Sequence, residues 1–85
     1  MTLESAIIDF LQHLKLERGL SDNTISAYRQ DLEAFAKSSS VKELSRISGS
    51  TVTTYFGNLT RVGMKPTSIV RKLSSLRQFF TYLVD

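Results

Sequence analysis

The stretch GMKPTSIVRKLSSLRQFFTYL, residues 63–83, decides most of what the sequence predicts about the fold. Gly63 separates this segment from the preceding one. Pro66 suits the first turn of a helix, because amides there have no hydrogen-bond partner within the helix and its missing N–H costs nothing. Advancing 100° per residue brings five large apolar side chains into a narrow arc: Ile69, Leu73, Leu76, Phe80 and Leu83. The stretch therefore predicts an amphipathic helix from Pro66 to at least Leu83, with these five residues buried.

The opposite side of this helix is polar and has no acidic residue between Pro66 and Val84. Solvent-facing helices usually mix charges of both signs, because opposite charges four residues apart stabilise them. The wheel places on this side Thr67, Ser68, Arg71, Ser74, Ser75 and Gln78, flanked by Lys72 and Arg77. Short hydroxyls, an amide and cationic groups are suited to the phosphates and base edges of a DNA major groove. The alternative is a solvated helix that happens to lack acids.

Two further helices are predicted upstream, from Thr2 to Glu17 and from Ser21 to about Lys37. Thr2 and Ser21 can accept hydrogen bonds from first-turn amides, and Gly19 permits the left-handed backbone that ends many helices. Apolar residues recur at helical spacing in both segments and form their predicted core faces, which are Ile7, Phe10, Leu11 and Leu14 in the first and Ile25, Tyr28, Leu32 and Phe35 in the second.

Residues 38–49 form a connector in which Val41, Leu44 and Ile47 are expected to attach a turn or short helix to the core. A third helix is predicted from Ser50 to about Thr60, burying Val52, Phe56 and Leu59. Its β-branched run from Thr51 to Thr54 also allows a strand, but no other segment of the sequence offers a partner strand. Helices with short links predict an all-α, compact four-helix bundle that occupies residues 1–85 as one domain.

The composition agrees with a folded domain and narrows its functions. Of 85 residues, 41% are hydrophobic and none is cysteine, so disulfides and cysteine-ligated zinc are excluded. A single histidine, His13, cannot build a metal site, and no cofactor is expected.

Residues 60–85 carry five basic side chains against one acidic, whereas residues 1–59 carry six against seven. This asymmetry favours an anionic partner such as nucleic acid. Neither a signal peptide nor a membrane span is apparent, so a cytoplasmic location is expected.

Three segments, in order, resemble the N-terminal domain of Xer-type tyrosine recombinases and phage integrases. Residues 19–32, GLSDNTISAYRQDL, are similar to the family's GLS-xNT-xxx-Y-xx-DL segment. Ile47 and the run Val52–Phe56 fall where the family has an I-xxxx-V-xx-YL helix. Residues 63–80, GMKPTSIVRKLSSLRQFF, are similar to its G-xxxx-SI-xRxLSxLRxFF helix. The resemblance extends over essentially the whole chain.

This resemblance implies a SAM-like orthogonal four-helix domain that forms half of a clamp around duplex DNA at a recombination half-site. The second and fourth helices would face the major groove, and Tyr28, Leu32, Leu73 and Leu76 would belong to the core. The DNA-binding residues predicted from the resemblance and the helical faces together are Thr24, Ser26, Ala27, Gln30, Lys65, Thr67, Ser68, Arg71, Lys72 and Ser75. Ser26, Ala27, Thr53 and Thr54 stand where relatives often carry longer or basic side chains, which predicts modest sequence specificity.

The chain is not expected to be an enzyme by itself. The family's catalytic half supplies two arginines, a lysine, histidines and a nucleophilic tyrosine, and Tyr28, Tyr55 and Tyr82 lack such partners in the sequence. Expected partners are double-stranded DNA, the catalytic domain of the same protein and neighbouring recombinase subunits, with the isolated domain monomeric. The alternative function is a helical protein-interaction module that uses apolar residues off the central stripe, such as Val70, Phe79 and Tyr82.

Overall fold

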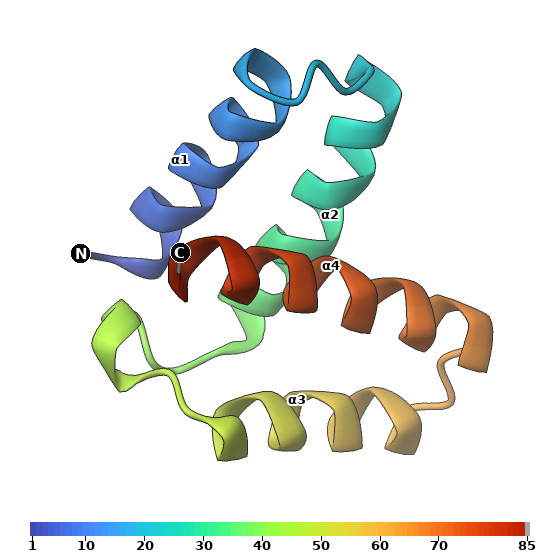
Figure 1. Cartoon of the computed structure of the whole chain (residues 1–85). Helices are drawn as coiled ribbons and strands as arrows, with labels where there is room; N and C mark the ends of the chain where they lie inside the picture. Colours follow the sequence, from blue (N-terminus) through green and yellow to red (C-terminus); the bar gives the residue numbers. More distant parts are fainter. Residues whose placement is uncertain (85) are drawn as a thin grey trace.

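The computed structural model describes residues 1–84 and confirms the all-α fold (Figure 1). Four α-helices and a short 3₁₀ helix follow one another along the chain: α1 (Leu3–Leu16), α2 (Asp22–Ser38), η1 (Leu44–Arg46), α3 (Gly49–Arg61) and α4 (Pro66–Val84). All four predicted helices are present, with ends within about two residues of their expected positions. The segment that also allowed a strand is α3, and residues 1–84 contain no β-strand.

The helices form two antiparallel pairs that cross each other (Figure 1). α1 and α2 make the first pair, and α3 and α4 make the second, which lies across one end of the first. α4 contacts α1, α2 and α3, whereas α3 packs principally on α4. The crossed arrangement is the orthogonal bundle that the resemblance implied, and it makes α4 the helix that joins the two pairs.

Helix ends follow the local chemistry of the sequence. The hydroxyl oxygens of Thr2, Ser21 and Ser48 accept hydrogen bonds from the backbone amides three residues later and so cap α1, α2 and α3. The cap of α3 is Ser48, two residues before the predicted start. Gly19 and Gly63 adopt φ values of 62° and 83°, a left-handed backbone that glycine tolerates best, where the chain leaves α1 and α3.

The core is built mainly from the first helix pair and is rich in aromatic rings. Phe10 of α1 lies at its centre, with ring centroids 5.5 Å from Phe79 and 5.9 Å from Tyr28. Phe35 of α2 packs edge-to-face on Tyr55, which is the one buried residue of α3. The predicted core faces of α1 and α2 are confirmed, with Tyr28 half-buried, whereas Val52, Phe56 and Leu59 are only partly buried.

The buried face of α4 differs from the predicted stripe. Leu76 is buried as expected, but Leu73 is exposed, and Ile69, Phe80 and Leu83 are only partly buried. The prediction that Phe79 lies off the buried stripe and is available to a protein partner is wrong, because Phe79 is fully buried against Phe10. α4 packs on two sides, so α1 and α2 bury one side, while Leu73 and Phe80 lie with Val52 in a shallow hollow beside α3.

The connector is attached to the start of α1. The Leu3 amide donates to the Lys42 carbonyl at 2.8 Å, and the Leu44 amide donates to the Met1 carbonyl at 3.0 Å. Leu44 and Ile47 pack against the core as expected, around the short helix η1. These two hydrogen bonds hold the connector that leads into α3 against the N-terminal residues of the chain.

Candidate nucleic-acid interface

A cleft between α2 and α4 brings together several of the predicted DNA-binding residues. α2 contributes Asn23, Thr24, Ala27, Tyr28 and Asp31, and α4 contributes Arg71, Ser74 and Ser75. The cleft therefore contains Thr24, Ala27, Arg71 and Ser75 of the predicted set, from segments more than 40 residues apart in the sequence. The rest of the set lies outside its lining.

The α2 side of the cleft is organised by the helix cap. The Ser21 hydroxyl accepts a hydrogen bond from the Thr24 amide at 3.2 Å and donates to the Thr24 hydroxyl at 3.0 Å. Thr24, Ser26 and Gln30 are exposed and Ala27 is half-buried. This half of α2 consequently offers small polar groups to a partner.

At the floor of the cleft, the buried carboxylate of Asp31 accepts hydrogen bonds from three side chains of α4. Its Oδ1 receives the Arg71 guanidinium at 2.9 Å and the Lys72 ammonium at 3.2 Å, and its Oδ2 receives the Ser75 hydroxyl at 2.7 Å. Asp31 is 1% exposed. We call Asp31, Arg71, Lys72 and Ser75 the Asp31 cluster. It links α2 to α4 by charge-assisted hydrogen bonds, which are stronger than neutral ones.

Burial and hydrogen bonding act in opposite directions on the Asp31 carboxyl. Burial raises its pKa, whereas the hydrogen bonds from Ser75, Arg71 and Lys72, together with the Lys72 charge, lower it. The net result is a pKa below the ordinary value of 3.8. Asp31 is therefore ionised at neutral pH, and its negative charge is matched by two cations.

The Asp31 cluster corrects the placement of two predicted residues. The helical wheel put Ser75 on the exposed side and Lys72 at its flank, but both side chains are buried. The cause is Asp31, which offers a buried acceptor that polar groups of α4 can reach. Arg71 differs from both, because its side chain is 56% exposed although one of its nitrogens binds Asp31.

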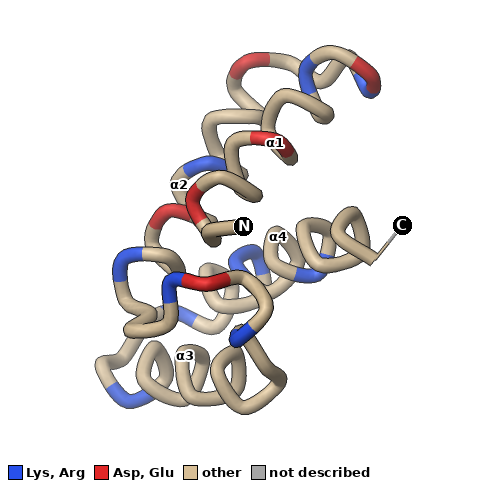
Figure 2. Tube along the Cα trace, turned by 90° about the vertical axis from the view of Figure 1, so that its left-hand side faces the viewer, with Lys and Arg blue, Asp and Glu red and all other residues tan. Residues whose placement is uncertain are grey.

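The other predicted residues of α4 lie at its start. Lys65 and Thr67 are exposed and Ser68 is half-buried. Figure 2 shows blue and no red along α3 and α4, whereas red segments occur on α1, α2 and the connector. The positive character predicted for the last third of the sequence is thus spread along one helix pair of the fold.

Sequence reasoning missed the role of Asp31, to which it assigned no contact. A signal was present. Asp31 directly precedes the core residue Leu32, and the acid-free helix α4 carries two adjacent cations with no acid of their own to pair with. Asn23 and Ser74 also line the cleft without having been predicted as contacts.

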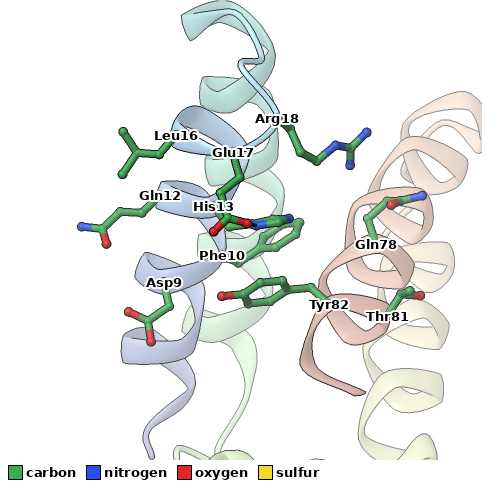
Figure 3. A pocket seen from close by; sticks show the side chains of 10 residues that line it. All are labelled: Asp9, Phe10, Gln12, His13, Leu16, Glu17, Arg18, Gln78, Thr81 and Tyr82. Atoms are coloured by element: carbon green, nitrogen blue, oxygen red, sulfur yellow. Dashed lines mark hydrogen bonds and ion pairs between the residues drawn. The ribbon is translucent and has the colours of Figure 1, made fainter. Parts of the chain in front are cut away.

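A second hollow lies between α1 and the end of α4, where Figure 3 shows Tyr82 reaching toward His13 and Phe10. The His13 Nδ1 atom is 2.7 Å from a Glu17 carboxylate oxygen, and its ring lies 4.8 Å from that of Tyr82.

Within residues 1–84 no three His, Cys, Asp or Glu side chains gather as metal ligands. In the same range, no helix has the length and apolar character required to cross a membrane.

Tyr55 is buried and packs against Phe35. Burial, and secondarily the negative charge of Asp31, raise its pKa above the ordinary value of 10.0. A raised pKa keeps the hydroxyl protonated and makes it a poorer nucleophile. Tyr28 and Tyr82 are half-buried and pack against Phe10. All three tyrosines therefore contact aromatic residues of the core.

The helical architecture and the residues along it define a class of protein. The model of the phage integrase N-terminal SAM-like domain matches residues 7–85, and the chain belongs to this family. Its curated relatives are tyrosine recombinases. The chain is 38% identical to XerD of Brucella abortus over 98% of its length, 44% identical to XerD of Proteus mirabilis over 91%, and 38% identical to XerC of Thermodesulfovibrio yellowstonii over 91%.

The chain spans about a quarter of the length of these relatives, covering 28%, 25% and 25% of them respectively. No solved structure matches the chain significantly. The family supports a role in recombination for a domain of this kind.

Proposed function

We propose that residues 1–85 form the DNA-binding module of a site-specific tyrosine recombinase or integrase. In this proposal α2 and α4 face the major groove of a recombination half-site, as one half of a clamp around the duplex. The observation that carries the proposal is the cleft between these two helices. It joins the capped start of α2 to the acid-free helix α4 and holds a half-exposed arginine at its opening.

The proposal assigns catalysis to another part of the recombinase. The chain corresponds to about a quarter of its relatives' length, which leaves room for a separate catalytic domain that supplies the nucleophilic tyrosine and its activating residues. Double-stranded DNA, that catalytic domain and neighbouring subunits are the proposed partners, with the isolated module monomeric. The proposed location is the cytoplasm, where a recombinase of this kind meets its DNA.

An NMR titration of the 85-residue chain with a short duplex tests the proposal. We expect amide shifts at residues 23–30 and 65–78 at low salt, and smaller shifts at high salt, because phosphate contacts release counterions. Arg71→Glu should abolish most of the binding, whereas Arg46→Glu, an equal charge change on the exposed connector, should reduce it only slightly. Shifts confined to α1 and the connector would refute the assignment of the interface to α2 and α4.

A protein-interaction module is the second candidate, and one observation favours it. Val70 and Leu73 of α4 are exposed apolar residues, at 64% and 38%. Such residues are suited to a protein partner more than to DNA. Analytical ultracentrifugation at high concentration tests self-association through this side of α4. A monomer that binds DNA would rule out self-association as the primary function.

A further inference from the structure

We infer that Arg71 recognises a guanine base in the bound DNA, and that Asp31 is the positioning residue that orients its guanidinium. The inference rests on the proposed DNA binding by α2 and α4. It assigns to one residue the sequence-reading contact, as distinct from the phosphate contacts that only hold the duplex in place.

The Arg71 guanidinium is hydrogen-bonded to Asp31 on one side, and the rest of the side chain is largely exposed. One terminal nitrogen lies 2.9 Å from Asp31 Oδ1, at the floor of the cleft, while the side chain as a whole is 56% exposed. A guanidinium has five N–H donors in a rigid plane. Among residues 1–84, Asp31 is the only hydrogen-bond partner of the Arg71 side chain, so donors remain for a ligand at the opening of the cleft.

Two buried side chains hold the Asp31 carboxylate in place independently of Arg71. The Lys72 ammonium and the Ser75 hydroxyl, both buried, hold the two oxygens of Asp31 from opposite ends of the carboxylate. The carboxylate plane is consequently fixed by the protein interior. The Arg71 guanidinium then binds a preset acceptor and is restricted to few orientations before DNA arrives, which favours a geometrically specific contact.

Hydrogen-bond geometry distinguishes a base contact from a phosphate contact. Asp31 pairs with both Arg71 and Lys72, so the cluster keeps one net positive charge and charge alone would suit either ligand. A two-point hydrogen bond to guanine O6 and N7 depends on the planar arrangement of donors more than on net charge. A carboxylate-held arginine is therefore better suited to guanine than to phosphate.

The surroundings leave room for a base edge. Across the cleft from Arg71, α2 presents Asn23, Thr24, Ala27 and Tyr28, and α4 adds Ser74 and Ser75. The Tyr28 ring packs against Phe10 and the other side chains are short, which leaves the exposed part of the guanidinium open. The exposed cations Lys65 and Arg77 have no acid bound to them in residues 1–84 and are the better candidates for phosphate contacts.

The test is selection of bound duplexes from a randomised 30-base-pair library, with sequencing, for the wild-type chain and for Arg71→Ala, Arg71→Lys and Arg77→Ala. We expect wild-type selection to enrich a guanine at a fixed position. Arg71→Ala should lose that preference, with the affinity for the enriched duplex falling roughly 5- to 150-fold, and Arg71→Lys, which lacks the planar fork of donors, should weaken the preference. Arg77→Ala should keep the preference and reduce affinity for all duplexes equally.

Replacing the enriched guanine by 7-deazaguanine removes the N7 acceptor and refines the test. This replacement should weaken binding by the wild-type chain and leave binding by Arg71→Ala unchanged. The inference is overturned if Arg71→Ala lowers affinity for every duplex equally and reduces the salt dependence by about one counterion, since that result identifies a phosphate contact. Absence of any DNA binding by the wild-type chain would instead refute the proposed function itself.

The role of Asp31 has its own readouts. In the free wild-type chain, the Arg71 Nε–Hε group should show ¹⁵N relaxation of an ordered side chain, unlike that of Arg77, and equal mobility of the two would overturn the positioning role. Asp31→Asn, if folded by circular dichroism, should bind random duplexes at least as well as wild type, because a negative charge is removed, while losing the guanine preference. A retained preference in this variant would show that Arg71 is not oriented by Asp31.

Discussion

The two helix pairs of this domain divide its tasks unequally. The α1–α2 pair holds eleven of the buried residues of the helices, including Phe10, Leu14 and Phe35, and carries charges of both signs. The α3–α4 pair buries only Tyr55 of α3 and four residues of α4, and has no acidic side chain between Gly49 and Val84. Buried side chains therefore lie mainly in the first pair and net positive charge in the second, and the Asp31 cluster joins them.

The largest effect should come from removing an aromatic side chain of the first pair. Phe10→Ala opens a cavity where the rings of Tyr28, Phe79 and Tyr82 meet, and should lower the free energy of unfolding by about 3–5 kcal/mol. Phe56→Ala is the matched control in the second pair, because Phe56 is only partly buried. Urea denaturation measures both. Equal losses would show that the two pairs contribute equally to the core.

The Asp31 cluster should rank next. Asp31→Ala leaves the Lys72 ammonium buried without its partner and should lower the free energy of unfolding by about 3 kcal/mol. Glu33→Ala removes an exposed carboxylate two residues away on α2 and should change it by no more than about 0.5 kcal/mol. Thermal and urea unfolding of both variants provide the comparison, and a small loss for Asp31→Ala would mean that water replaces the carboxylate.

The same carboxyl predicts a smaller, pH-dependent effect. Since folding lowers the Asp31 pKa below 3.8, its contribution to stability is complete above that value and is lost as the pH falls through the lower folded pKa. The stability difference between wild type and Asp31→Asn should therefore be constant from pH 7 to 5 and narrow below pH 4. Urea midpoints measured across this range test the sign. A difference that widens toward acid would contradict a lowered pKa.

The sequence predicted the first pair better than the second. Apolar side chains at helical spacing in α1 and α2 face one core, so their periodicity identified the buried residues correctly, as with Phe10 and Leu32. α4 packs between α1–α2 and α3, and a single stripe cannot represent two contact faces. The prediction was therefore wrong for Leu73 and Phe79.

The sequence identified the two helices of the candidate site but not which of their polar side chains are buried. The helical wheel and the family resemblance together identified Thr24 and Arg71, which line the cleft. They could not show that Lys72 and Ser75 point inward, because that depends on Asp31, which is more than 40 residues away in the sequence and comes into contact only through folding. Buried polar groups need partners, and the partner here belongs to another helix.

The smallest predicted effect concerns the start of α3, where the second pair depends on local chemistry. Ser48 accepts a hydrogen bond from the Thr51 amide, and the Thr51 hydroxyl accepts one from the Ser48 amide, which together form a capping box. The following helix is rich in β-branched residues, and Tyr55 is its one buried residue. Ser48→Ala should lower stability by about 1 kcal/mol.

Hydrogen exchange shows whether that loss is local. Amides 49–56 should exchange faster in Ser48→Ala, while those of α1 keep their protection, because α3 packs principally on α4 and adds little to the core. Thr53→Ala is the control, since Thr53 is exposed, has no side-chain hydrogen bond within residues 1–84, and is replaced by a better helix former. Uniformly faster exchange in Ser48→Ala would mean that the two pairs unfold as one unit, and that their unequal shares of the core have no counterpart in local stability.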